Sequence, residues 1–258
     1  KPGEIALITQ WVQEGAEWGD HWSFNPPAKV PLPEAADPTW PSQALDHFVL
    51  ARLEFEKRTP SPAAPPAQWL RRATFDLTGL PPTLADLRAF ESAVAASGEE
   101  AYTAAADRLL ASPAYGEHLA AMWLDLARYS DTFGFEKDPH RDIWPFRDWV
   151  IQALNNNLSL DKFITWQLAG DLLPNPTLEQ VVATGYVRMN ATTNEGGSIP
   201  EEFQAKNNFD RVENLGTAFL GLSLLCARCH AHKYDPISQQ EYHELLAFFN
   251  NTAEKPLD

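Results

Sequence analysis

Apolar residues recur every three or four positions along most of the chain, whereas strand-like alternation is nearly absent. Residues 4–13 place Ile5, Ile8, Trp11 and Val12 on one stripe, which indicates an amphipathic helix. Further stretches have the same spacing, and loops rich in Gly, Pro and Asn separate them. We expect helices over residues 68–76, 99–111, 114–129, 145–156, 161–169, 178–188, 202–225 and 239–250. The pattern predicts an all-α fold, a multi-helix domain with long Pro/Gly-rich loops.

Polar residues suited to capping mark two further helix starts. Ser42 has the character of an N-cap, because helical spacing begins just after it at Leu45. Thr83 is followed three residues later by Asp86, which is the arrangement of a capping box. Residues 18–41 are rich in Trp and Pro and have no sustained period, so we expect a long loop or linker there.

Length and charge narrow the class of protein. A chain of 258 residues corresponds to one large domain or a domain plus a fragment, since domains usually have about 100–200 residues. The 35 acidic and 20 basic residues give a net charge of -15, which disfavours nucleic acid as a partner. No apolar run approaches the roughly 20 residues that span a bilayer, so no membrane span is expected. The chain opens directly into a helical pattern, and we expect any export signal to lie upstream.

Both cysteines of the chain lie in one short segment, unlike the distributed cysteines of a disulfide-stapled scaffold. The segment Cys226-Ala227-Arg228-Cys229-His230 has the C-x-x-C-H pattern. Two thiols three positions apart on a helical turn can add to both vinyl groups along one edge of a haem. The adjacent histidine can then ligate the iron. The spacing therefore predicts one covalently bound haem c, with His230 as the proximal iron ligand.

The approach to this motif is expected to be a continuous helix that ends at Leu225. Its apolar face would form a dry wall against the porphyrin, and it comprises Leu215, Phe219, Leu222 and Leu225. A redox-active cysteine pair is one alternative for the motif, but such pairs are expected near a strand–helix junction. No strand is predicted before Cys226, so this alternative is disfavoured.

A zinc site is a second alternative, since thiolate and imidazole both suit that metal. The four candidate zinc ligands are Cys226, Cys229, His230 and His232. Four ligands within seven residues leave little chain to wrap a tetrahedron, and structural zinc sites usually combine two separated pairs. Haem attachment is therefore the favoured interpretation of the motif.

The distal iron ligand is left open by the sequence. The candidates are Met189, His140, Met122 and His118. An open sixth position is also compatible with the sequence and would indicate catalysis rather than electron transfer. Arg147 and Arg141 are candidates for binding the haem propionates, because guanidinium groups match carboxylates bidentately. The alternative for Arg147 is a local ion pair at a helix N-terminus.

The loop at residues 193–197 and the glutamates that follow it also admit two interpretations. The loop Thr193-Asn194-Glu195-Gly196-Gly197 could bind a cation or substrate together with Glu201 and Glu202. A turn before an acidic first helical turn is the simpler interpretation, because carboxylates there interact favourably with the helix dipole. We favour the second interpretation.

Several motifs resemble the planctomycete-type cytochrome c family in its second domain type. The resemblance rests on CARCHAHKYDPI at 226–237, followed by Tyr242 and AFFNN at 247–251. Three other stretches agree with it. They are DLTGLPPT at 76–83, WLDLARY at 123–129 with WPFRDW at 144–149, and QLAGDLLP at 167–174 with EGG at 195–197. Together they cover residues from about 40 to 251.

This resemblance implies a division of the chain into three parts. Residues 1–24 resemble the C-terminal helix and exit segment of an upstream, first-type cytochrome c domain. Residues 25–41 would be a Pro-rich linker, and residues 42–258 the helical c-type haem domain. The chain departs from the family at Ala231, where an aspartate is frequent between the two histidines. An acidic neighbour that could orient His232 is therefore absent.

The resemblance also implies a setting and a role. It implies a large exported multidomain protein in the periplasm or cell envelope. Redox partner domains or proteins, and flanking domains of the same polypeptide, would be its partners. We expect electron transfer rather than catalysis by this chain alone. The alternatives are a peroxidase-like or oxidative haem enzyme with an open sixth iron site, and a structural domain whose site is vestigial or holds zinc.

Overall fold

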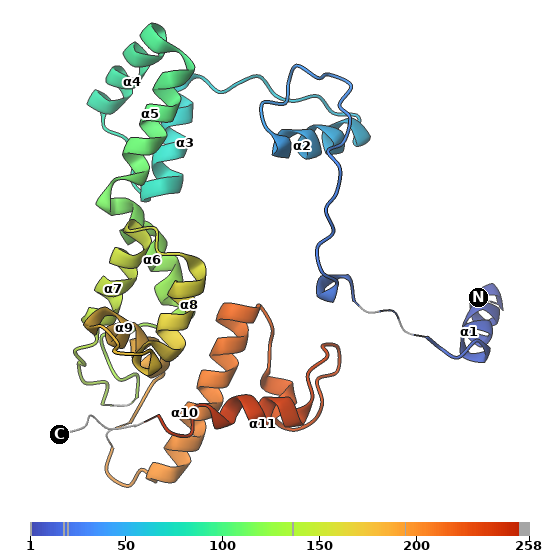
Figure 1. Ribbon diagram of the computed structural model, residues 1–258, viewed down its shortest axis with the longest axis vertical. Coiled ribbons are helices and arrows are strands. Elements are labelled where there is room, and N and C mark those ends of the chain that lie inside the picture. Colours follow the sequence, from blue (N-terminus) through green and yellow to red (C-terminus); the bar gives the residue numbers. More distant parts are fainter. Residues whose placement is uncertain (1, 18, 20, 136, 194, 253–258) are drawn as a thin grey trace. The chain divides into compact units, whose positions relative to one another are not determined.

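The structure is a computed structural model that describes residues 2–17, 19, 21–135, 137–193 and 195–252. Among these residues the regular structure is helical, apart from one isolated bridge between Thr132 and His140. The prediction of an all-α fold is therefore confirmed (Figure 1). The chain divides into two compact units, Lys1–Ala63 and Ala64–Asp258. No helix in the described part combines the length and the apolar character that crossing a bilayer requires.

The first unit contains helix α1 (Pro2–Gln13), a short 3₁₀ turn (Trp22–Phe24) and helix α2 (Ala44–Phe55). The prediction that Ser42 is an N-cap is wrong, because Gln43 occupies that position. Ser42 instead donates its backbone N–H and its hydroxyl to the carboxylate of Asp46, both at 2.9 Å. The same carboxylate accepts the N–H of Gln43 at 3.0 Å. One acidic side chain thus satisfies the backbone donors that precede the helix.

The second unit begins with three packed helices, α3 (Pro66–Thr78), α4 (Leu84–Ser97) and α5 (Glu99–Leu110). Their shared core contains four buried residues, Leu70, Phe90, Ala101 and Ala105. The predicted capping box at the start of α4 is confirmed. Thr83 Oγ1 accepts the N–H of Asp86 at 3.1 Å, and the Asp86 carboxylate accepts the N–H of Thr83 at 3.0 Å.

A second core forms among α6 (Pro113–Ala127), α7 (Trp144–Asn155), α8 (Leu160–Ala169) and α9 (Leu178–Ala183). Aromatic rings dominate it, as in the stacked pair Trp149 and Phe163, whose centroids are 5.4 Å apart. The helix predicted over residues 178–188 is present, but its second half, Thr184–Arg188, is wound as a 3₁₀ helix.

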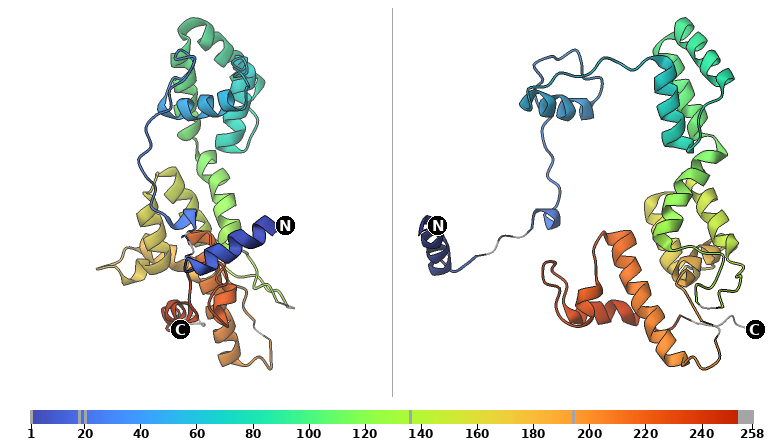
Figure 2. Two further views of the ribbon diagram at one scale, coloured as in Figure 1. Left: turned by 90° about the vertical axis from the view of Figure 1, so that its right-hand side faces the viewer. Right: turned by 180° about the vertical axis from the view of Figure 1, so that it is seen from behind.

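The last helices are α10 (Pro200–Leu215) and α11 (Gln239–Ala247), which pack against each other (Figure 2). The prediction of one helix over residues 202–225 is wrong. Helix α10 passes into a π-helical turn, Gly216–Leu220, and then ends at Gly221 with a φ of 65°. A left-handed glycine of this kind is a common helix terminus. The chain turns back there, and the Leu224 side chain packs so closely on Gly216 that an added Cβ would lie 2.5 Å from it.

Candidate functional site

The C-x-x-C-H motif forms a single tight turn at the end of a short 3₁₀ helix (Leu225–Arg228). The N–H groups of Cys229 and His230 both donate to the carbonyl of Cys226, at 3.3 and 3.4 Å. Ala227 is fully buried, whereas the two free cysteines are exposed. The buried alanine therefore fixes the turn against the protein and leaves both thiols at the surface.

Ala227 is buried in a core that α10 and α11 share with the segment between them. Its other buried members are Val212, Leu224, Tyr242 and Phe249. The expected dry wall of apolar residues is found only in part. Leu215 and Leu222 pack on this core, but Leu225 is 56% exposed and Phe219 packs on the core of α6–α9. The wall is divided because the helix that was expected to carry it ends before Leu222.

His230 has a defined tautomer. Its ring Nδ1 lies 2.8 Å from the carbonyl oxygen of Ala231. A carbonyl only accepts hydrogen bonds, so Nδ1 must carry the proton. Nε2 of the neutral ring is then the unprotonated nitrogen, and the side chain is exposed. This arrangement leaves a metal-binding nitrogen available beside the two thiols.

His232 differs from His230 in that its side chain is only 7% exposed. Its Nδ1 accepts the backbone N–H of Asp235 at 2.9 Å and that of Tyr234 at 3.3 Å. The Asp235 carboxylate lies 3.3 Å from the same nitrogen, but the shorter contact with the N–H requires a lone pair there. The backbone N–H of His232 also donates to the carbonyl of Ile237 at 2.8 Å. His232 therefore stabilises the turn that follows the motif.

The zinc alternative requires Cys226, Cys229, His230 and His232 to converge. Within the described part of the chain, no three Cys, His, Asp or Glu side chains gather as metal ligands would. The lone pair of His232 Nδ1 is directed at backbone N–H groups of its own turn. The zinc geometry is thus not formed by these residues.

A polar cluster lies between the motif and α10. The guanidinium of Arg228 stacks over the ring of Phe209, with its central carbon 3.6 Å from the ring centroid. Oε1 of Glu213 and the hydroxyl of Tyr242 are both buried without a well-formed hydrogen bond. Burial raises the pKa of Glu213 above its usual value, and the nearby Arg228 partly opposes this. Burial and the Glu213 carboxylate raise the pKa of Tyr242 to about 12.

Replacing Glu213 with glutamine is expected to raise stability at neutral pH. A carboxyl group whose pKa is raised by folding stabilises the protein below its usual pKa of 4.5 and loses that contribution as pH rises through the folded pKa. The glutamine of the Glu213→Gln variant stays neutral beside Arg228, Asp210 and Tyr242 at every pH. The variant should therefore keep this contribution to stability as the pH rises. Urea unfolding midpoints of the wild-type chain and the variant should therefore coincide at acidic pH. At neutral pH the midpoint of the variant should be higher. Glu201→Gln, which removes an exposed charge from the same helix, should produce no such gain.

The four candidate distal ligands lie in different surroundings. Met189 is 1% exposed within the core of α6–α9, and Met122 is 54% exposed on α6. His118 packs against Gly79, where an added Cβ would lie 2.6 Å from its Nδ1. His140 is exposed, and its Nε2 lies 3.2 Å from Asp142. None of these four residues belongs to the core on which the motif packs. The role of each as a distal iron ligand therefore stays a prediction.

The two arginines predicted to bind propionates make contacts within the protein. Arg147 pairs with the adjacent Asp148 in the first turn of α7, through Nε at 3.0 Å and Nη2 at 2.9 Å. Arg141 is half-buried and donates to the backbone carbonyls of four residues, at 3.0 to 3.4 Å. These are Ser130, Arg188, Met189 and Asn190. Arg141 therefore joins the loop before α7 to the segment before α10.

A cavity of about 1030 Å³ lies on another part of α10 and has none of the motif residues in its wall. It is bounded by the loop before α7, the segment before α10, the first turns of α10 and the residues after α11. The side chains that give it its character are Arg141, Arg188, Arg211, Asn190, Asn207 and Glu195. Two of these residues were also singled out in the sequence: Glu195 in a candidate loop site, and Arg141 as a candidate for binding haem propionates.

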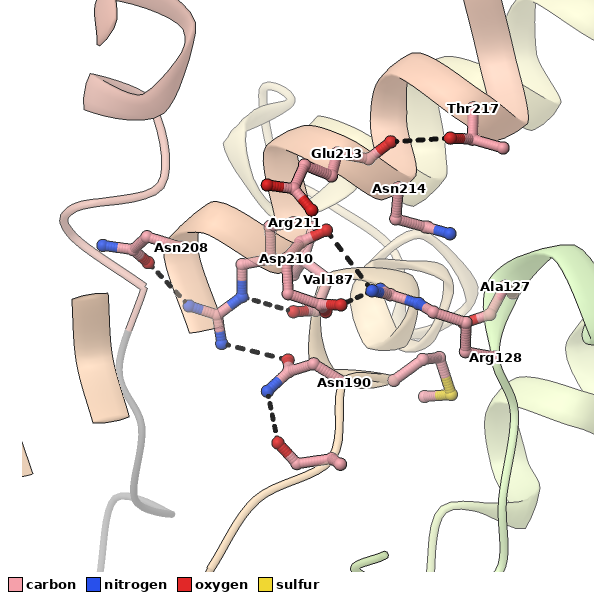
Figure 3. A network of polar contacts seen from close by, with 12 residues as sticks. Ala127, Arg128, Val187, Asn190, Asn208, Asp210, Arg211, Glu213, Asn214 and Thr217 are labelled. Atoms are coloured by element: carbon pink, nitrogen blue, oxygen red, sulfur yellow. Dashed lines mark hydrogen bonds and ion pairs between the residues drawn. The ribbon is translucent and has the colours of Figure 1, made fainter. Parts of the chain in front are cut away.

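Arg211 holds one wall of this cavity in place and is only 4% exposed. Figure 3 shows its guanidinium between three acceptors from two segments of the chain. Nε donates to the Val187 carbonyl at 2.8 Å, Nη1 to Asn208 Oδ1 at 2.9 Å and Nη2 to Asn190 Oδ1 at 3.4 Å. The buried residues Asn207, Arg211 and Asn214 follow one another at helical spacing. Polar residues therefore occupy helical positions where apolar core residues would be expected. This pattern is the sequence signal that could have located the wall of the cavity.

The same helix is tied to α6 by a second group of polar contacts. Arg128, the left-handed C-cap residue of α6, forms an ion pair with Asp210. Asn214 donates to the carbonyl of Leu126 at 2.8 Å and accepts the hydroxyl of Tyr186. Helix α10 therefore has a fixed position, with the motif core on one part of its surface and the cavity on another.

The chain was compared with known protein families, curated proteins and solved structures. Residues 44–254 match the model of a family, PSCyt2, whose description is "Protein of unknown function (DUF1549)". No curated protein and no solved structure matches the chain.

Proposed function

Because the chain belongs to the PSCyt2 family, a planctomycete-type domain family, we propose that it is a c-type haem domain acting in electron transfer. Cys226 and Cys229 would hold one haem covalently, and His230 would bind its iron. The observation that carries the proposal is the geometry of the motif. Two exposed thiols lie on one turn, and in the residue that follows Cys229 the hydrogen bond from His230 Nδ1 leaves Nε2 unprotonated.

The donor set of this turn fits a haem. A haem bound here would supply a one-electron couple at its iron. Each thiol would form a thioether with one vinyl group, and the imidazole would offer Nε2. The carbonyl of Ala231 accepts the other ring N–H, which orients the imidazole and increases its basicity.

The exposure of the motif side chains favours electron transfer to a partner over catalysis in a buried active site. All three side chains of the site, Cys226, Cys229 and His230, are exposed. The apolar side chains of Leu225 and Tyr234 flank them and are 56% and 80% exposed. We propose that redox partner domains or proteins approach this surface, within a larger exported protein of the periplasm or cell envelope.

The visible spectrum of the chain, exported through a host c-type maturation system, tests this proposal. We expect sharp, split bands after reduction and a low-spin oxidised spectrum. His230→Gln should change the iron coordination, whereas His243→Gln should leave the bands intact, because His243 Nε2 contacts only a backbone carbonyl of the motif, that of Arg228 at 3.3 Å. A high-spin spectrum that shifts with carbon monoxide would favour the haem enzyme instead, and a colourless protein would refute haem binding.

A further inference from the structure

The cavity beside α10 differs in charge from the rest of the chain. Among the described residues, its wall carries three arginines and one glutamate, whereas the whole chain has a net charge of -15. Arg141 donates to backbone carbonyl oxygens of the wall, which fixes its positive charge at the edge of the cavity. The side chain of Arg188 is exposed. A local excess of positive charge in a concave site attracts anions.

The polar residues of the wall also favour a ligand with hydroxyl groups. Asn190 and Asn207 are buried, and amides both donate and accept hydrogen bonds, as hydroxyls do. Oε1 of Glu195 is buried and has no hydrogen-bond partner among the residues that the structure describes. A buried acceptor without a donor is costly, and a ligand hydroxyl would satisfy it. An anion without a hydroxyl group, such as sulfate, could not donate to this atom.

The size and apolar parts of the cavity agree with an organic ligand. Its volume of about 1030 Å³ lies at the upper end of the usual range for small-molecule sites, about 300–1,000 Å³. The rings of Phe133 and Phe203 contribute apolar surface to the wall. Aromatic faces of this kind suit the C–H groups of a polyhydroxylated ring.

We propose that this cavity binds a sugar acid, that is, a polyhydroxylated ring bearing a carboxylate. The carboxylate binds Arg188, and the positive charge of Arg141 adds to the attraction. Glu195 and Asn190 bind the hydroxyls. This site is separate from the C-x-x-C-H motif, because no residue of the motif lines the cavity. The proposal therefore goes beyond electron transfer and does not depend on it.

An NMR titration of the isotope-labelled chain with galacturonate, galactose and phosphate tests the site. We expect galacturonate to bind at least tenfold more tightly than galactose or phosphate and to shift the backbone signals of residues 188–193 and 195–198. Arg188→Gln should weaken galacturonate binding at least tenfold. Arg72→Gln removes an exposed positive charge from α3 and should leave the affinity unchanged.

Three outcomes would overturn the proposal: no binding of galacturonate, equal binding of phosphate, or equal losses in the two arginine variants. The titration is repeated on the Cys226→Ser/Cys229→Ser variant, which has no thiols for haem attachment. Unchanged affinity there is expected. Failure of haem binding and failure of the sugar-acid site are thus measured separately.

Discussion

Replacing both Cys226 and Cys229 with serine is expected to abolish covalent haem attachment completely. These are the two cysteines of the chain, so no other thiol can form a thioether. A serine hydroxyl does not add to a vinyl group under the same conditions. After expression with a maturation system, haem staining on a denaturing gel should show a stained band for the wild-type chain and none for the variant.

The fold should survive this change, because both side chains are exposed and serine is nearly the same size. The two cysteines make no disulfide, and the turn is anchored by the buried Ala227. Far-UV circular dichroism should therefore be unchanged. The single variants keep one thiol each and should retain reduced staining.

The matched control lies inside the motif. The Arg228→Gln variant keeps both thiols and His230. In the wild-type chain the side chain of Arg228 lies over the ring of Phe209. Staining should be retained in this variant. Haem that stays bound to the double serine variant after denaturation would contradict thioether attachment. Loss of staining in Arg228→Gln as well would attribute the effect to the turn rather than to the thiols.

Replacing Arg211 with leucine is expected to destabilise the second unit by roughly 3–5 kcal/mol. The guanidinium is buried and donates to Val187, Asn208 and Asn190. Leucine would leave these acceptors buried without donors, and each unsatisfied group costs about 1–3 kcal/mol. Urea unfolding followed by far-UV circular dichroism should show a correspondingly lower midpoint.

Two variants separate the hydrogen bonds from the charge. Arg211→Lys keeps the charge but loses the planar fork of donors, so we expect an intermediate loss. Arg72→Leu, at an exposed site on α3, should change stability by no more than about 0.5 kcal/mol. An Arg211→Leu variant as stable as Arg72→Leu would show that the network in Figure 3 does not support the fold.

Helix positions can be predicted closely from the sequence because helix caps and the spacing of apolar residues involve residues that are near one another in the chain. The capping box of Thr83 and Asp86 lies within four residues, and both partners are visible in the sequence. Ser42 shows the limit of this approach. It was expected to cap α2, but Asp46 binds the donors of Ser42 and shifts the N-cap to Gln43.

The end of α10 could not be predicted from spacing alone. Leu215, Phe219 and Leu222 are spaced as in a continuing helix, and Gly221 alone does not end one. The chain turns there because Leu224 packs on Gly216 and joins the core with Tyr242 of α11. That core includes residues that come later in the chain, so the end of α10 is set by tertiary packing.

The all-α fold and the position of the candidate haem site both follow from local sequence patterns. The chemistry of that site lies within five residues, Cys226 to His230, and even the tautomer of His230 depends only on the neighbouring Ala231. Only the tertiary structure shows that Arg141 and Arg211 are wall residues and that a cavity exists beside α10. These features join segments far apart in the sequence. Burial and long-range hydrogen bonds, which have no local pattern, bring them together.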